Sequence, residues 1–317
     1  MTTFDLGPWA TFGYEDDVRP SLARVLRVGP AVLATIVRLE GGGPRPVGTQ
    51  MVFGAHEVAG FLSGGCIESD VALHAAACLE DGEPRQLVYG QGSPWPDIRL
   101  LCGSSLTVLV ERVLPDDPAA ASLFAMAQAR RPAVWLTDGR RRLCASPGEV
   151  DAWPGAFTRP HDPPWRLVVL GGDPTALAVA SLGLACGYET TLVRALGPAE
   201  PPPIAGLAYR RERPDVALAA IGPDRWTAVA ACHHDLDLDD AALRAALRTP
   251  APYVGLLGGR ARLAERLERL RQAGFTENDL AKLHAPIGLD LGGKAPFEVA
   301  VSVLGEITAL RHEKLAA

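Results

Sequence analysis

The chain has 317 residues, of which 48% are hydrophobic and 21% are charged, and its formal net charge is −6. The composition is typical of a globular protein, and the length exceeds that of one ordinary hydrophobic core, so we expect two domains. The negative charge argues against nucleic acid or an anionic membrane as the main partner. Because no apolar segment reaches the length of a membrane span and residues 1–17 lack a signal-peptide pattern, we expect a cytoplasmic protein.

The cysteines are spaced singly, without a C-x-x-C pair or the spacing of a zinc ribbon. A structural zinc site is therefore not expected, and in a reducing compartment the thiols should be free. The six positions are Cys66, Cys78, Cys102, Cys144, Cys186 and Cys232.

The first half of the chain is predicted to be mainly β structure, because short segments rich in β-branched and aromatic residues alternate with turn residues. A turn is expected at Asp138–Gly139, inside the last of these segments. The predicted strands lie within residues 31–40, 49–54, 57–65, 85–90, 104–113 and 133–146.

One helix interrupts this β region, at residues 67–82, with Val71, Ala75 and Cys78 on one side and Gly82 as its stop. Cys66 stands directly before it, in the sequence "GGCIESD". A thiol at the N-terminus of a helix faces unpaired N–H groups and the positive end of the helix dipole, which favours the thiolate. Cys66 is therefore a candidate nucleophile or metal ligand, and a small buried side chain in a tight turn is the alternative.

The second half is predicted to be a doubly wound α/β domain. A strand at residues 165–172, a helix at 174–187 and a second strand at 188–196 form the first βαβ unit of a parallel sheet. Residues 147–165 are rich in proline and have no helical or strand period, so we expect a linker there. The predicted organisation is a mainly β or α+β domain at residues 1–146 and a Rossmann-like domain at 166–317.

The loop after the first strand of this second domain departs from the dinucleotide fingerprint G-x-G-x-x-G. Asp173 replaces the middle glycine of the stretch that begins at Gly171, and its carboxylate would oppose a bound phosphate. Arg194 follows the second strand, where an acidic residue would hold the ribose hydroxyls. The strand, loop and helix predict a Rossmann-like fold, but the sequence lacks two features that are typical of NAD(P) binding.

Three stretches carry a family resemblance: "GGCIESD", "APYVGLLGGRARLAERL" and "LHAPIGLDLGGKAPFEVAVSVLGEITAL". With them the chain resembles the XdhC/CoxI family of xanthine dehydrogenase accessory proteins, from about Pro30 to the final helix. The resemblance implies a factor that binds molybdenum cofactor, a pyranopterin bearing a phosphate, and supports its sulfuration and insertion. The implied partners are a xanthine dehydrogenase-type molybdenum hydroxylase and a cysteine desulfurase, and a homodimer is a further expectation.

The resemblance also implies site residues. Cys66 matches the cysteine of the family motif SGGC(V/I)E, and Cys102 matches the cysteine of its GCGG segment. A soft thiolate suits molybdenum or a sulfur-transfer step, and flanking glycines let the cofactor approach closely. The residues expected to bind the cofactor are Cys66, Cys102, Gly64, Gly65, Glu68, Arg45, Gly171 and Gly172.

Two of these residues have plain alternatives. Glu68 could accept a proton or hold its loop, and capping of the helix N-terminus is the alternative. Arg45 could bind phosphate or a carboxylate, and an exposed loop arginine is the alternative.

The family pattern T-H-D-H-x-x-D corresponds here to "ACHHDLDLDD", where His234 and Asp237 keep their places and Cys232 stands at the first histidine. These residue types after a strand could ligate a metal, so His234 joins Cys66 and Cys102 as a candidate ligand. A polar loop capped by Asp237 or Asp239 is the alternative.

Three functional hypotheses remain open from the sequence. The first is a cofactor chaperone that is not a turnover enzyme. Its distinguishing features are Cys66 and Cys102 in glycine-rich loops of the first domain and the altered dinucleotide loop of the second. The second is an NAD(P)-dependent oxidoreductase, for which a bound phosphate would have to tolerate Asp173. The third is an interaction module without catalysis that docks onto a hydroxylase or a sulfur donor.

Overall fold

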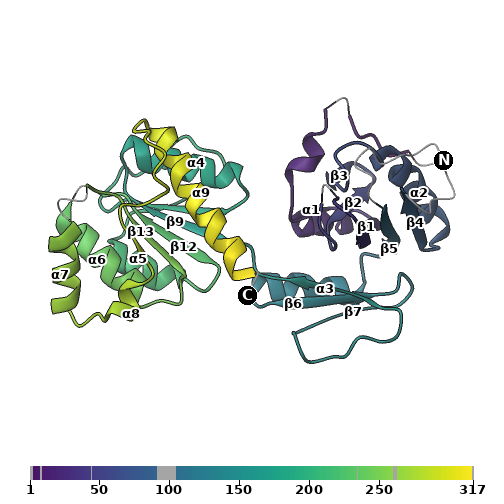
Figure 1. Ribbon diagram of the computed structural model, residues 1–317. Helices are drawn as coiled ribbons and strands as arrows, with labels where there is room; N and C mark the ends of the chain where they lie inside the picture. Colours follow the sequence, from purple (N-terminus) through teal and green to yellow (C-terminus); the bar gives the residue numbers. More distant parts are fainter. Residues whose placement is uncertain are drawn as a thin grey trace. The chain divides into compact units, whose positions relative to one another are not determined.

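The computed structural model describes residues 3–7, 9–43, 45–90, 105–233, 235–259 and 263–315, with backbone alone for residues 313–315. The chain forms two compact units, Met1–Pro163 and Pro164–Ala317 (Figure 1). Each unit has its own hydrophobic clusters, and we describe each by itself.

Five strands within the described part of unit 1 form an antiparallel sheet in the order β3-β2-β1-β5-β4. These strands are β1 (Ala31–Glu40), β2 (Gln50–Gly54), β3 (Glu57–Gly60), β4 (Arg85–Tyr89) and β5 (Ser105–Val113). Both faces of β1 are covered, because Val32 and Ala34 pack in one cluster and Ala31 and Leu33 in another. This double burial explains why the first six residues of β1 are all buried and why Thr35 is the one polar residue among them.

Helix α2 (Glu68–Asp81) covers one face of this sheet through Val71, Ala75 and Cys78. It ends at Gly82, whose backbone is left-handed with φ +76°. The helix predicted at residues 67–82 is thus present, with its predicted stop. The other face is covered by α1 (Arg19–Leu26), which the short 3₁₀ helix η1 (Thr11–Tyr14) precedes, and α3 (Pro118–Gln128) contributes to the same hydrophobic cluster.

A second, three-stranded sheet in unit 1 has the order β7-β6-β8. It consists of β6 (Ala133–Thr137), β7 (Arg142–Ala145) and β8 (Phe157–His161). Strand β8 lies inside residues 147–165, so the prediction of a structureless linker there is wrong for this part. The strand is held by pairing with β6, from Ala133 opposite His161 to Thr137 opposite Phe157, and local sequence does not reveal that pairing.

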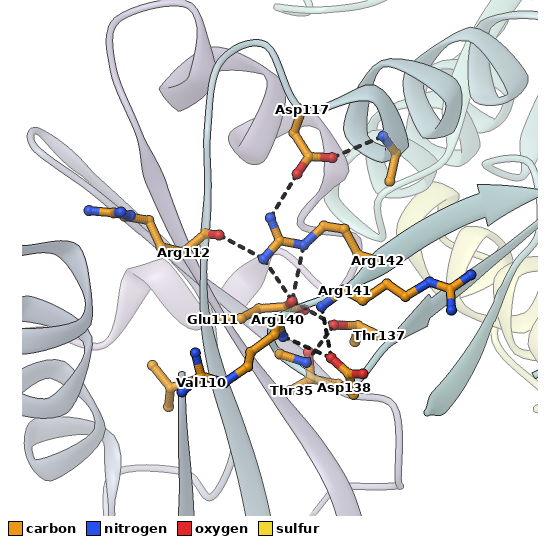
Figure 2. A network of polar contacts seen from close by, with 12 residues as sticks. Thr35, Val110, Glu111, Arg112, Asp117, Thr137, Asp138, Arg140, Arg141 and Arg142 are labelled. Atoms are coloured by element: carbon orange, nitrogen blue, oxygen red, sulfur yellow. Dashed lines mark hydrogen bonds and ion pairs between the residues drawn. The ribbon is translucent and has the colours of Figure 1, made fainter. Parts of the chain in front are cut away.

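A buried polar network joins the two sheets of unit 1 (Figure 2). The carboxylate of Glu111, on β5, is fully buried and accepts hydrogen bonds from the hydroxyl of Thr137 at 2.7 Å and from Nε of Arg142 at 3.1 Å. Arg142 also donates to the carboxylate of Asp117 and to the carbonyl of Arg112, both at 2.7 Å. Burial raises the pKa of Glu111, and the nearby Arg142 guanidinium opposes this rise.

Unit 2 contains a parallel sheet whose described strands have the order β11-β10-β9-β12-β13-β14. The strands are β9 (Arg166–Leu170), β10 (Glu189–Val193), β11 (Ala208–Arg210), β12 (Thr227–Ala231), β13 (Tyr253–Leu256) and β14 (Leu283–His284). This is the strand order of the Rossmann fold, with the switch point between β9 and β12. The predicted α/β fold class is confirmed.

Helices cover both faces of this sheet (Figure 1). Helices α4 and α9 pack on one face, and α5, α6 and α7 pack on the other. Their bounds are α4 (Pro174–Ala185), α5 (Pro214–Ile221), α6 (Leu236–Leu247), α7 (Leu263–Gln272), α8 (Glu277–Leu280) and α9 (Pro296–Leu315). Among the described helices of the whole chain, none combines the length and apolar character needed to cross a membrane.

Candidate functional site

The predicted thiol loop connects β3 to α2 and includes the two adjacent glycines Gly64 and Gly65. Both have left-handed backbones, with φ +84° and φ +111°. An added Cβ would meet no atom within 4 Å at either position, so the backbone conformation and not packing requires glycine here. The loop is therefore a sharp, open turn on the surface.

Glu68, the first residue of α2, organises this loop. Its carboxylate is 1% exposed and accepts hydrogen bonds from the Ser63 hydroxyl at 2.7 Å and from the amides of Ser63 at 2.7 Å and Gly65 at 2.9 Å. The amides of Leu62 and Gly64 also donate to it. Burial alone would raise the pKa of Glu68, but these hydrogen bonds outweigh burial and lower it. An ionised carboxylate that is occupied by so many donors holds the loop and is poorly suited to accept a proton.

Cys66 lies at the exposed edge of this turn. Its amide donates to the Ser63 hydroxyl oxygen at 3.0 Å, and its side chain is an exposed free thiol. Helix α2 begins two residues later, after the N-cap Ile67. The geometry therefore presents the thiol to solvent beside a helix N-terminus, where a ligand or a sulfur donor can reach it.

Arg45 is not a free loop arginine. Its guanidinium lies over the ring of Phe61, 4.6 Å from the ring centre, and pairs with the carboxylate of Asp16. Burial lowers the pKa of Arg45, and its Nε atom is buried without a hydrogen-bond partner among the described residues. Phe61 follows β3 directly and begins the thiol loop, so Arg45 is anchored at the base of that loop.

Two predicted ligands, Cys102 and His234, lie outside the described residues. Their expected roles beside Cys66 stay predictions. Within the ranges that the structure describes, no group of three or more His, Cys, Asp or Glu side chains is placed to hold a metal ion.

The glycines of the Rossmann loop have structural reasons for their identity. A Cβ on Gly171, whose φ is +148°, would come within 2.6 Å of the Cys232 carbonyl oxygen. A Cβ on Gly172 would collide with the side chain of Arg194. The backbone contact accounts for glycine at position 171, whereas at position 172 the neighbour is a flexible side chain; that both glycines bind a cofactor stays a prediction.

Asp173 serves as the N-cap of α4. Its carboxylate accepts a 2.8 Å hydrogen bond from the amide of Ala176. In dinucleotide-binding proteins the pyrophosphate sits at this helix N-terminus. A negatively charged side chain already occupies the position here, which argues against binding of NAD(P).

The loop after β12 contains a buried arrangement that the sequence alone did not reveal. Nδ1 of His233 lies 3.6 Å from the carboxylate of Asp239, and that carboxylate pairs with Arg266 at 2.6 Å. Helix α6 is capped by Asp235 and not by Asp237 or Asp239, the two expected caps. The position of His233 at the end of a buried strand was the available signal, but nothing local distinguished it from its neighbour His234.

Taken together, the fold and the loops define a two-domain α/β protein: a β-rich unit with an exposed thiol loop and a Rossmann-type unit with an altered dinucleotide loop. Two family models match the chain, "XdhC and CoxI family" over residues 26–90 and "XdhC Rossmann domain" over residues 167–307. A molybdenum cofactor insertion chaperone of Escherichia coli is 31% identical over 89% of this chain and 83% of its own length. The chain belongs to the XdhC/CoxI family.

Two further relatives extend this comparison. A protein of Bacillus subtilis, named as a probable component of xanthine dehydrogenase, is 24% identical over 89% of this chain and 93% of its own length. A crystal structure from Bacillus halodurans, described as a xanthine dehydrogenase, has a TM-score of 0.76 and covers 93% of this chain and 96% of that one. Because that chain is only 21% identical, the likeness establishes the fold alone.

Proposed function

We propose that this protein is a maturation factor that binds molybdenum cofactor in the cytoplasm and delivers it to a xanthine dehydrogenase-type molybdenum hydroxylase. The observation that carries the proposal is the exposed thiol of Cys66, presented on a loop that the buried carboxylate of Glu68 holds. The relative at 31% identity, named as a molybdenum cofactor insertion chaperone, supports the same role.

The chemistry of the loop suits a cargo that must be bound and then released. A thiolate is a soft ligand for the metal of the cofactor, and an exposed position lets a partner displace it. Because the Glu68 carboxylate is occupied by loop donors, Cys66 is the group in this loop that is free to react. Support of cofactor sulfuration, with a cysteine desulfurase as the sulfur donor, belongs to the same proposal.

Arg45 supplies the positive charge for this site. Its ion-pair partner Asp16 has a side chain that is 82% exposed, so an anion of the cargo can replace Asp16 at small cost. The ring of Phe61 keeps the guanidinium in place during such an exchange. We assign Arg45 to an anionic group of the cofactor.

The oxidoreductase hypothesis receives less support, because the Asp173 carboxylate caps α4 where a dinucleotide would place its pyrophosphate. The third hypothesis, an interaction module, does not account for a thiol held at the surface by a dedicated carboxylate.

The test is uptake of molybdenum cofactor by the purified full-length protein, with Cys66→Ser and Cys102→Ser compared against wild type. Cys186→Ser is the matched control, because Cys186 is also an exposed free thiol. We expect Cys66→Ser to lose cofactor retention and Cys186→Ser to keep it, with NADH and NADPH titrated in parallel. Tight nucleotide binding without cofactor uptake would instead establish the oxidoreductase.

A further inference from the structure

A cavity of about 870 Å³ lies in unit 2, and its described lining includes no residue of the Rossmann loop. One wall is the segment after β13, which includes Leu257 and Gly259, and the other is the segment between β14 and α9. Its volume is within the range of cavities that bind cofactors and other small molecules. Both walls continue directly from the carboxyl ends of parallel strands, and open α/β sheets bind ligands outside those ends.

The cavity walls are braced from α9. The carboxylate of Glu306 accepts hydrogen bonds from the Tyr253 hydroxyl at 2.6 Å and from the Gly288 amide at 2.9 Å, and it pairs with His284 at 3.0 Å. The hydroxyl of Ser302 donates to a backbone carbonyl of the same loop. These contacts fix the second wall to α9, and the first wall follows directly from strand β13, so the cavity is largely formed before a ligand enters, which lowers the cost of binding.

The walls are mostly apolar and contain one glycine that the fold does not require. Leu257, Ile287, Leu291 and Val299 line the cavity, and Leu291 is 58% exposed. Gly259 has no left-handed φ, and a Cβ at this position would meet no atom within 4 Å. Its missing side chain leaves the backbone open on the cavity wall, where a planar ring can approach it.

Lys294 is the cationic side chain in this lining, and its ammonium forms no ion pair within the described ranges. The amides of Lys294 and Ala295 are already taken by the carboxylate of Glu298, so the helix end itself offers little to an anion. A phosphate in this cavity would therefore be held by the Lys294 side chain. The described lining also contains one carboxylate, that of Asp290, so a phosphate would have to lie at Lys294 and away from Asp290, and the apolar remainder suits a flat heterocycle.

We infer that this cavity binds the pterin and phosphate of the cofactor cargo, with the ring against Gly259 and Leu257 and the phosphate at Lys294. The inference rests on the proposed function, because only that function names the cargo. It adds a binding site in unit 2 for the organic part of the cofactor, separate from the Cys66 loop of unit 1.

The experiment measures ligand affinity of the full-length protein by fluorescence. The probes are molybdenum cofactor released from a molybdenum hydroxylase, neopterin monophosphate, neopterin and AMP. Gly259→Leu fills the cavity, and Gly29→Leu is its matched control, since Gly29 also has an ordinary φ and no atom within 4 Å of an added Cβ. Thermal unfolding of each variant shows whether its fold is intact.

We expect Gly259→Leu to weaken binding of the cofactor and of neopterin monophosphate at least tenfold, and Gly29→Leu to leave both unchanged. Lys294→Ala should weaken the binding of neopterin monophosphate three- to tenfold and leave the binding of neopterin unchanged. Lys294→Arg should restore most of the lost affinity.

The outcomes separate the two proposals. Cofactor uptake that is equal in wild type and Gly259→Leu would overturn the cavity assignment and leave the proposed function standing. Binding of AMP with exclusion of both pterins would overturn the ligand assignment. Failure of the wild type to take up any molybdenum cofactor would overturn the proposed function and the inference with it.

Discussion

The hydroxyl of Ser63 donates a 2.7 Å hydrogen bond to the buried carboxylate of Glu68, five residues further along the chain. The same hydroxyl oxygen accepts hydrogen bonds from the amides of Cys66 and Ile67. Ser63 thus connects the carboxylate that organises the thiol loop to the residue that carries the thiol. Ser63 was not singled out from the sequence; its hydroxyl accepts amides of the turn before α2, whose N-cap is Ile67.

Replacing Glu68 by Gln puts an amide NH₂ group among N–H donors and leaves part of them unsatisfied. We expect Glu68→Gln to lower the free energy of unfolding by about 2 kcal/mol, because buried donors lose their acceptor. Denaturant unfolding measures this change. Glu200→Gln, at an exposed glutamate outside the loop, should have no effect, and equal stability of both variants would contradict the assigned role of Glu68.

The thiol loop should loosen in acid. The pKa of Glu68 is lowered in the folded protein, so its stabilising effect is complete above the ordinary glutamate pKa of 4.5 and disappears as pH falls through the folded value. Amide hydrogen exchange of residues 62–67, corrected for intrinsic rates, should therefore accelerate below about pH 4. The same profile in Glu68→Gln, which has no carboxylate to protonate, should be flat, and a flat wild-type profile would be inconsistent with this linkage.

Removing Arg142 should destabilise unit 1 strongly, because Glu111 and Asp117 would lose their cationic partner in a buried setting. We expect Arg142→Met to cost about 3 kcal/mol of unfolding free energy. Arg140→Met is the control, since the Arg140 side chain is 71% exposed and its ion pair with Glu83 lies at the surface. Arg140→Met should change the free energy of unfolding by less than about 0.5 kcal/mol. Similar losses of stability in Arg140→Met and Arg142→Met would contradict the claim that burial makes the Arg142 ion pairs important.

The thiols should differ widely in reactivity. Cys66 and Cys186 are exposed, whereas burial raises the pKa of Cys144 to about 11 and that of Cys232 to about 12. At pH 8 a thiol reagent should label Cys66 and Cys186 within minutes and the buried Cys78, Cys144 and Cys232 only on unfolding. Mass mapping of the labelled native protein checks this order. Rapid labelling of Cys232 would mean that the end of β12 opens readily.

Substituting Asp173 by Gly tests why this Rossmann domain resists a dinucleotide. The change removes a carboxylate from the α4 N-terminus and restores the middle glycine, at a helix-capping cost of a few tenths of a kcal/mol. NADH binding, followed by fluorescence, should be absent in wild type and measurable in Asp173→Gly. Tight binding by the wild type would show that the cap does not exclude the cofactor.

The elements that depend on local pattern were predicted well from the sequence. The βαβ start of unit 2 and the α2 stop at Gly82 follow from hydrophobic periodicity and from glycine at a left-handed position. The strand predicted at residues 57–65 is too long, because β3 ends at Gly60. The Glu68 carboxylate accepts hydrogen bonds from the amides of Leu62 and Ser63, which follow β3. Those amides are therefore unavailable for pairing in a sheet.

Features that depend on distant partners were missed. Strand β8 forms because β6 pairs with it, and the stacking of Arg45 on Phe61 joins segments that the sequence keeps apart. At the β6–β7 connection the sequence suggested a two-residue turn, but the loop spans residues 138–141. There the Asp138 carboxylate accepts hydrogen bonds from the amides of Arg140 and Arg141. These local hydrogen bonds compete with the tighter turn.

The placement of Glu111 also bears on how unit 1 unfolds. Its backbone belongs to the five-stranded sheet, while its hydrogen-bond donors Thr137 and Arg142 belong to the three-stranded one. Separating the sheets would leave a buried carboxylate without its donors, so a partly folded form with one sheet melted is penalised. Two sheets built from different strands are thereby made to melt cooperatively, as one thermodynamic domain.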